Sequence, residues 1–184
     1  MLTLTFLVKT LIDIYVMVLL LRIWMQWSRC DFYNPLAQFV VKITQPVVKP
    51  LRRIIPAIGP VDTASLLLAF VLTTLKYPIL LLIQVGAFSV DPMNLLVGLL
   101  SLVKSAGYLV FWVIIIRSLM SWISQGRGAV DYVLIQLTEP LMAPIRRILP
   151  AMGGIDFSAM VVILILYMFN YLGMDLFPGL WYLL

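Results

Sequence analysis

The chain is divided into four long apolar stretches separated by more polar segments. The apolar stretches cover approximately Leu4–Trp27, Val61–Gly86, Leu95–Ile123 and Ile155–Phe177. Each is long enough to supply the ~20 residues that a helix needs to cross a ~30 Å hydrocarbon core. The stretches are too long and too uniformly apolar for the strands of a membrane barrel, and only a helix satisfies its own backbone there. The pattern therefore predicts an all-α membrane protein with four transmembrane helices. The first stretch lacks a basic leader and a small-x-small cleavage site, so we expect it to be a retained helix and not a signal peptide.

The overall composition supports lipid as the solvent. Of the 184 residues, 63% are hydrophobic and 11% are charged, and the mean hydropathy is +1.08. A soluble domain carries about 25% charged residues and could not bury this much apolar surface. The net charge of +5 comes from basic residues just outside the apolar stretches. We therefore expect anionic lipid headgroups as partners and no nucleic acid.

Several kinds of chemistry are excluded by composition. The chain has no histidine and one cysteine, Cys30, so it has no intramolecular disulfide, no histidine-based catalytic triad and no ordinary zinc set. We expect no catalytic residues, no metal and no cofactor, and we interpret Cys30 as a passive thiol. The protein is accordingly predicted not to be an enzyme.

The two halves of the chain are similar to each other. A shift of 94 matches Thr44–Asp62 to Thr138–Asp156, and ten of these nineteen positions are identical. A shift of 95 matches Arg22 to Arg117. We therefore predict one repeat over residues 1–86, a short connector over 87–93 and a second repeat over 94–184. Because each repeat holds two spans, both copies enter the membrane in the same sense, which predicts parallel helix–loop–helix repeats.

Basic residues predict the orientation of the chain. The loops Ser28–Pro60 and Ser124–Gly154 carry five and three basic residues, eight in total, whereas Ala87–Met93 carries none. The positive-inside rule places both loops in the cytoplasm and both termini outside it. Lys9, near the amino terminus, is a weaker signal in the opposite direction. We expect a multi-pass protein of the bacterial inner membrane with periplasmic termini.

The repeated loop motif contains the candidate site residues. In each copy, prolines and a glycine surround a pair of arginines, and an aspartate comes just before the next span. Pro46 and Pro140 are predicted to begin a short helix, which ends before Pro56 and Pro150. The glycine permits a reversing turn, and the aspartate caps the following helix. The candidate residues are Pro46, Pro50, Arg52, Arg53, Pro56, Gly59, Asp62, Pro140, Pro144, Arg146, Arg147, Pro150, Gly153 and Asp156.

Three interpretations of the arginine pairs remain open. The loops orient the spans and rest in the interface, where each basic side chain near anionic lipid contributes about 1 kcal/mol. Alternatively, the two loops form a paired cytoplasmic surface that docks a partner protein. A third interpretation is binding of a substrate or an ion. Upstream, Pro35–Ile43 and Val130–Leu137 are predicted to be amphipathic helices lying flat on the membrane, with Phe39, Val40 and Ile43 on one face.

Charged residues within the spans fall into two groups. Lys9 and Arg22 lie thirteen residues apart, about 20 Å along a helix, and Lys104 and Arg117 repeat this spacing. We interpret all four as anchors that reach the two interfaces. An aromatic belt of Trp24, Trp27 and Trp122 is predicted at the cytoplasmic ends.

Asp13 and Lys76 form the second group, because both are predicted to lie inside the membrane. Intramembrane ionisable residues are costly and are candidates for function. The structural alternative is an ion pair that holds the two helices of the first repeat together. The repeat shifts place Tyr108 and Asn170 at the corresponding positions, so we expect a Tyr–Asn contact in the second repeat.

The chain resembles the YggT family of bacterial membrane proteins over almost its whole length. The resemblance rests on the doubled Pro-x-Arg-Arg-Ile-x-Pro-Ala-x-Gly unit and on the segments Leu20–Trp27, Cys30–Pro35, Tyr132–Leu137 and Met152–Phe157. By this resemblance, related single-repeat proteins are linked to cell division and envelope organisation. A related plastid protein is linked to the assembly of a cytochrome b/f complex. Two-repeat members are associated with osmotic tolerance and potassium uptake. The resemblance carries over no catalytic residues.

Two hypotheses about function follow. The first is a non-enzymatic assembly or scaffold protein whose paired basic loops bind a membrane-protein partner. The second is a small ion-linked transporter or channel component, which would work as a homo-oligomer because four helices enclose little space. Nothing in the sequence resembles a carbonyl-lined potassium filter. The absence of a catalytic constellation favours the first hypothesis.

Overall fold

The computed structural model describes residues 1–153 and 156–184. Over these residues the chain is helical, with an isolated β-bridge between Ile58 and Val61. The helices in chain order are α1 (Leu2–Trp27), α2 (Pro35–Ile54), α3 (Thr63–Val85), α4 (Met93–Ile123), α5 (Ala129–Ile148), α6 (Ser158–Leu176) and α7 (Leu180–Leu183).

Four of these helices, α1, α3, α4 and α6, are long and apolar enough to cross a membrane. The predicted all-α membrane fold with four spans is therefore confirmed. The helices begin and end within about three residues of the apolar stretches read from the sequence. Ile155, where the fourth stretch begins, lies outside the described residues. The large exposed side chains of the four long helices are predominantly apolar, as a lipid-facing surface requires.

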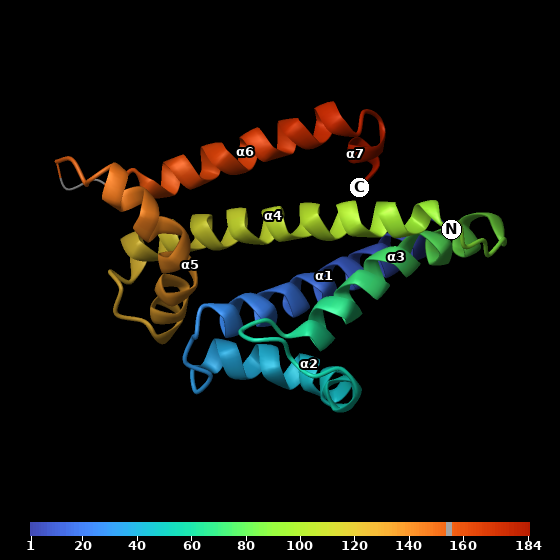
Figure 1. Cartoon of the computed structure of the whole chain (residues 1–184), viewed down its shortest axis with the longest axis horizontal. Helices are drawn as coiled ribbons and strands as arrows, with labels where there is room; N and C mark the ends of the chain where they lie inside the picture. The colour runs from blue at the N-terminus through green and yellow to red at the C-terminus, as the bar shows by residue number, and fades with distance from the viewer. Residues whose placement is uncertain (154–155) are drawn as a thin grey trace.

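The four long helices run approximately along one direction, with the short elements gathered at their ends (Figure 1). The chain termini and the α3–α4 connection lie at one end of the molecule. The helix α5 lies at the opposite end, and α2 runs from that end beneath α1 and α3 (Figure 1). Eight of the thirteen basic residues belong to the loops that contain α2 and α5, so the two ends of the molecule differ in charge.

The first three long helices pack closely. Val16 and Leu19 of α1 are buried with Ala64 and Ala69 of α3, and small residues permit this close approach of membrane helices. The helices α3 and α4 approach closely at Gly98, where an added Cβ would lie 2.8 Å from the Cα of Thr74. The helix α6 is different, since Ser158, Val162 and Gly173 are its buried residues. The bundle is therefore tight around α1, α3 and α4 and loose at α6.

The prolines of the motif lie inside helices and do not begin them. Pro46 and Pro50 fall within α2, and Pro140 and Pro144 fall within α5, so the predicted helix starts at Pro46 and Pro140 are wrong. The helix α2 begins earlier because the Asn34 side chain accepts a hydrogen bond of 3.0 Å from the Leu36 amide. Each proline removes one helical hydrogen bond and bends the helix, and Figure 1 shows α2 changing direction along its length.

The buried face of α2 also differs from the prediction. Ala37 and Val40 are buried against Val133 and Leu137 of α5 in a shared apolar cluster, whereas Phe39 is exposed. The face is rotated because α2 packs on α1 and α5 at once. The helix ends at Ile54 and Ile148 agree with the prediction that Pro56 and Pro150 prevent continuation.

Candidate functional site: two arginine–aspartate clusters and an intramembrane ion pair

The first cluster forms where α1, α2 and α3 meet. Asp62 is the N-cap of α3 and is fully buried, with its carboxylate between two arginines. The Nε of Arg22 lies 3.2 Å from Asp62 Oδ2. Arg52 binds the same carboxylate with both ends of its guanidinium, at 2.9 Å from Nη2 to Oδ2 and 3.2 Å from Nε to Oδ1. Asp62 thus connects three helices through one side chain.

Neutral side chains complete this cluster. Arg22 donates to Thr44 Oγ1 at 2.7 Å and to Gln45 Oε1 at 3.0 Å, and Arg52 donates to Gln26 Oε1 at 2.9 Å. Ser65 donates its hydroxyl to Asp62 at 2.8 Å. A buried charge is tolerated when it is both paired and fully hydrogen-bonded, and these contacts meet that requirement.

The electrostatics of Asp62 follow from the same contacts. Burial acts to raise the pKa of Asp62, because the charged form loses water. The hydrogen bonds from Arg52 and Ser65 and the charge of Arg52 outweigh burial, and they hold the pKa below its ordinary value. The carboxylate is therefore ionised at neutral pH.

The second cluster has similar members but a more open arrangement. Arg146 donates to Asp156 at 2.9 Å and to both carboxylate oxygens of Glu139 at 3.0 Å. Arg117 donates instead to the hydroxyl of Thr138 and to the sulfur of Met142, both of which are neutral. The side chain of Asp156 is 41% exposed, against 0% for Asp62. The aspartate therefore connects three helices in the first half of the chain, and in the second half it pairs with Arg146 of α5.

The two arginines of each pair have different environments. Arg52 and Arg146 face inward and bind the aspartate that precedes the next span. Arg53 and Arg147 are exposed. Their neighbours Ile54 and Ile148 are 80% and 86% exposed. The motif thus separates an internal arginine from an external one, whereas the sequence interpretation treated the pair as a unit.

The remaining motif residues shape the turn before the next span. Gly59 and Gly153 have φ values of +59° and +62°, the left-handed region that favours glycine. Asp156 accepts a hydrogen bond of 2.9 Å from the Ser158 amide, one position earlier relative to its helix than Asp62. The predicted helix cap is therefore confirmed at Asp62, whereas the N-cap of α6 is Phe157, so the predicted cap at Asp156 is wrong.

The structure brings Asp13 and Lys76 together. Lys76 Nζ lies 3.0 Å from Asp13 Oδ1 and donates to Ser101 Oγ at 3.2 Å, so the contact joins α1, α3 and α4. Lys76 is 2% exposed. The Tyr–Asn contact expected in the second half stays a prediction: Tyr108 and Asn170 line one cavity, and Asn170 Oδ1 accepts a hydrogen bond of 2.9 Å from Trp181 Nε1.

Two residues have roles that the sequence interpretation missed. Arg22 was interpreted as an interfacial anchor, yet it is buried and central to the first cluster. Thr44 was part of the repeated motif without an assigned role. The sequence did contain a signal for both roles, because Arg22 and Thr44 are matched by identical residues, Arg117 and Thr138, in the second half. Trp24 is likewise buried, so it does not belong to an exposed belt.

Cys30 is a buried free cysteine. Burial raises the pKa of the Cys30 thiol to about 11, which keeps it protonated at neutral pH. Among the residues that the structure describes, no three histidine, cysteine or acidic side chains gather as a metal site would require.

Comparison with known proteins gives the family. The family model described as CCB3/YggT matches residues 1–83 and 96–177. The chain is 56% identical to the protein YggT of Escherichia coli (strain K12), with 97% of each chain covered. It is 52% identical to a protein encoded in the proC 3′ region of Vibrio alginolyticus, with 98% of each covered. No solved structure matches. The chain therefore belongs to the CCB3/YggT family.

Proposed function

We propose that this protein is a non-enzymatic assembly or scaffold protein of the bacterial inner membrane. It binds a membrane-protein partner through two docking edges, which we define as Arg53, Ile54 and Ile58 in the first half and Arg147, Ile148 and Met152 in the second. The observation that carries the proposal is the exposure of a large apolar side chain directly beside an exposed arginine in both copies of the motif.

The chemistry of the docking edges indicates the kind of partner. Large exposed apolar side chains beside a charge are typical of protein contacts. The guanidinium of Arg53 or Arg147 would pair with a carboxylate, and the neighbouring isoleucine would enter an apolar cleft. The internal arginines, Arg52 and Arg146, hold each edge in position through the aspartates.

The docking experiment separates the external arginines from the internal ones. Crosslinking in intact membranes, followed by identification of the crosslinked protein, gives the partner. Arg53→Gln with Arg147→Gln should reduce capture of that partner without changing insertion. Lys42→Gln with Lys49→Gln is the matched control, since it removes the same charge from exposed positions on α2. Equal losses from the two double variants would overturn the proposal in favour of a general attraction to anionic lipid.

The proposal includes an orientation with both termini in the periplasm. It is supported by the basic residues of the loops that contain α2 and α5. Cysteines introduced at Ala129 and Ser89 of a Cys30→Ala variant would be tested with an impermeant thiol reagent. Labelling of position 89 but not 129 in intact, outer-membrane-permeabilised cells is expected. The reverse pattern would place the docking edges outside the cytoplasm.

Two parallel repeats also belong to the proposal. The separate matches of the family model to residues 1–83 and 96–177 support them. An experimental structure in a bilayer should superpose Thr44–Asp62 on Thr138–Asp156 with both segments at one depth. Segments on opposite faces of the membrane would exclude parallel repeats.

A role in ion transport, of the kind associated with osmotic tolerance, is the second candidate function. The Asp13–Lys76 ion pair favours it, because charges within a span occur in ion and proton pathways. Purified protein in liposomes should then conduct potassium, and Asp13→Asn with Lys76→Met should abolish the flux. If the native protein conducts no potassium, this candidate function is excluded and the docking role remains.

A further inference from the structure

An apolar cavity of about 430 Å³ opens between α4, α6 and α7. Its apolar wall includes Phe111, Leu166, Phe169 and Leu172. This volume falls within the ~300–1,000 Å³ typical of ligand pockets. The first half of the chain has tight α1–α3 packing in the corresponding place. The cavity is therefore a feature in which the two halves differ.

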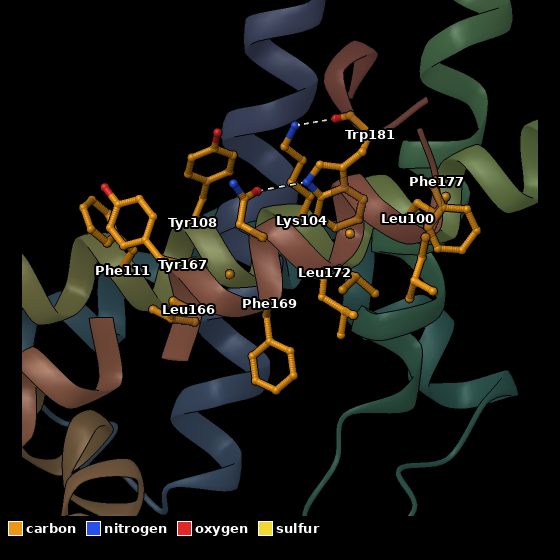
Figure 2. A pocket seen from close by; sticks show the side chains of 15 residues that line it. Leu100, Lys104, Tyr108, Phe111, Leu166, Tyr167, Phe169, Leu172, Phe177 and Trp181 are labelled. Carbon is orange, nitrogen blue, oxygen red and sulfur yellow. Dashed lines mark hydrogen bonds between the residues drawn. The ribbon is translucent and has the colours of Figure 1, made fainter. Parts of the chain in front are cut away.

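The polar groups of the cavity gather on one side. Figure 2 shows the ammonium of Lys104 and the hydroxyl of Tyr108 on one side of the cavity, with Leu166, Phe169 and Leu172 pointing to the other. Lys104 Nζ donates to the Trp181 carbonyl at 2.7 Å. An ammonium has three N–H donors, so two remain for a ligand.

Asn170 is also oriented as a donor. Its Oδ1 accepts the Trp181 indole N–H, which directs the amide NH₂ elsewhere. Lys104, Tyr108 and the Asn170 amide thus present hydrogen-bond donors at the polar edge. Such an edge fits an anion with several acceptor oxygens, and a phosphate has this property.

Two lysines, Lys9 and Lys104, supply an excess of positive charge beside the cavity. Lys9 lies one turn before Ile12 of α1, which shares an apolar cluster with Leu102 of α4, and Asp13 already pairs with Lys76. Lys9 is exposed on α1 and corresponds to Lys104 under the repeat shift of 95. Asp175 of α6 does not line the cavity. The region therefore has two cations, Lys9 and Lys104, whose charges a phosphate would neutralise.

We propose that this cavity binds a phospholipid with an anionic headgroup. The phosphate lies between Lys104 and Lys9 and accepts hydrogen bonds from Tyr108 and Asn170. One acyl chain enters the apolar space between α4 and α6. A zwitterionic headgroup would bring its own cation towards the two lysines and is disfavoured. This site is separate from the docking edges at the opposite end of the bundle.

The test is native mass spectrometry of the full chain in detergent. Phosphatidylglycerol and phosphatidylcholine with identical acyl chains are added at equal concentrations. The native protein should retain phosphatidylglycerol preferentially. Lys104→Gln and Lys9→Gln should each reduce that preference by about fivefold, the factor expected for one basic side chain near an anionic lipid. Lys49→Gln, which removes an exposed charge on α2, should leave it unchanged.

A second variant tests the acyl-chain space. Gly107 lines the cavity, and a Cβ added there meets nothing within 4 Å. Gly107→Leu should fold normally, because leucine favours helix over glycine, while it fills the cavity and lowers lipid retention.

Four outcomes would overturn the proposal, of which displacement of the lipid by inorganic phosphate is the last. One is equal retention of the two lipids by the native protein, and another is a preference that Lys104→Gln leaves intact. The third is a dimer that Gly107→Leu dissociates, which would make the cavity an interface between copies. Addition of inorganic phosphate should not displace the lipid, whereas displacement would identify a free-phosphate site.

Discussion

Arg22 and Asp62 lie 3.2 Å apart although forty positions separate them in the chain. Both side chains are buried, and the contact fixes the end of α1 against the start of α3. Breaking such a pair is costly, because the remaining charge is left without a partner in a site that excludes water.

Asp62→Asn should therefore lower the free energy of unfolding by about 3–5 kcal/mol. Asp156→Asn is the matched control in the second half, where the aspartate is exposed, and it should cost about 0–1 kcal/mol. Unfolding in mixed detergent micelles, followed by circular dichroism, measures both. Equal losses would mean that the burial difference between the two clusters has no energetic consequence.

The Asp13–Lys76 contact predicts coupling between two substitutions. Asp13→Asn leaves Lys76 unpaired in the membrane, which costs up to about 2.5–3.5 kcal/mol. Lys76→Met leaves Asp13 unpaired, and Asp13 is the more exposed partner, so the loss is smaller. The double variant should recover most of the stability in a double-mutant cycle. Strictly additive losses would show that the ion pair contributes nothing.

Two glycines of α4 should respond oppositely to alanine. At Gly98 an added Cβ would lie 2.3 Å from Thr74 Oγ1 and 2.8 Å from the Thr74 Cα, so Gly98→Ala must separate α3 from α4. Gly107→Ala meets nothing within 4 Å and should stabilise α4 by roughly 0.8–1.0 kcal/mol. Thermal unfolding of the two variants measures the difference. A stable Gly98→Ala protein would contradict the close α3–α4 contact.

Acid should weaken the first cluster through Asp62. Its pKa is held below the ordinary value of 3.8 in the folded protein, so the unfolded chain takes up a proton first as the pH falls. The stability that ionised Asp62 contributes to the fold is complete above its ordinary pKa. It is lost as the pH falls through the lower pKa of the folded protein. Melting temperatures between about pH 7 and about pH 3 should fall more steeply for the native protein than for Asp62→Asn. Parallel curves would exclude Asp62 as the source of acid sensitivity.

The fold could be predicted from the sequence because its signals are local. An apolar run of sufficient length determines each span, a glycine permits each turn, and an aspartate before α3 marks its cap. The face of α2 that is buried could not be predicted from such local signals. Ala37 is buried and Phe39 exposed because α2 contacts α1 and α5 together, and the pattern of one helix does not contain that arrangement.

The candidate site was predictable only in part for a related reason. Asp13 and Lys76 stood out because charges are rare in spans. Arg22 lies at a span end, where an anchoring role is common, and its contact with Asp62 depends on the fold of α2 between them. The looseness of α6 could not be predicted from its apolarity, because α3 and α6 are both apolar enough to cross a membrane.

The distances along the chain between paired charges also limit how the protein is made. During synthesis α1 emerges with Asp13 and Arg22, but their partners come 63 and 40 residues later. Until α3 follows, α1 carries an unneutralised acid and an unneutralised base. We therefore expect α1 to stay beside water or protein until α3 arrives, so that the two helices enter the lipid as a hairpin.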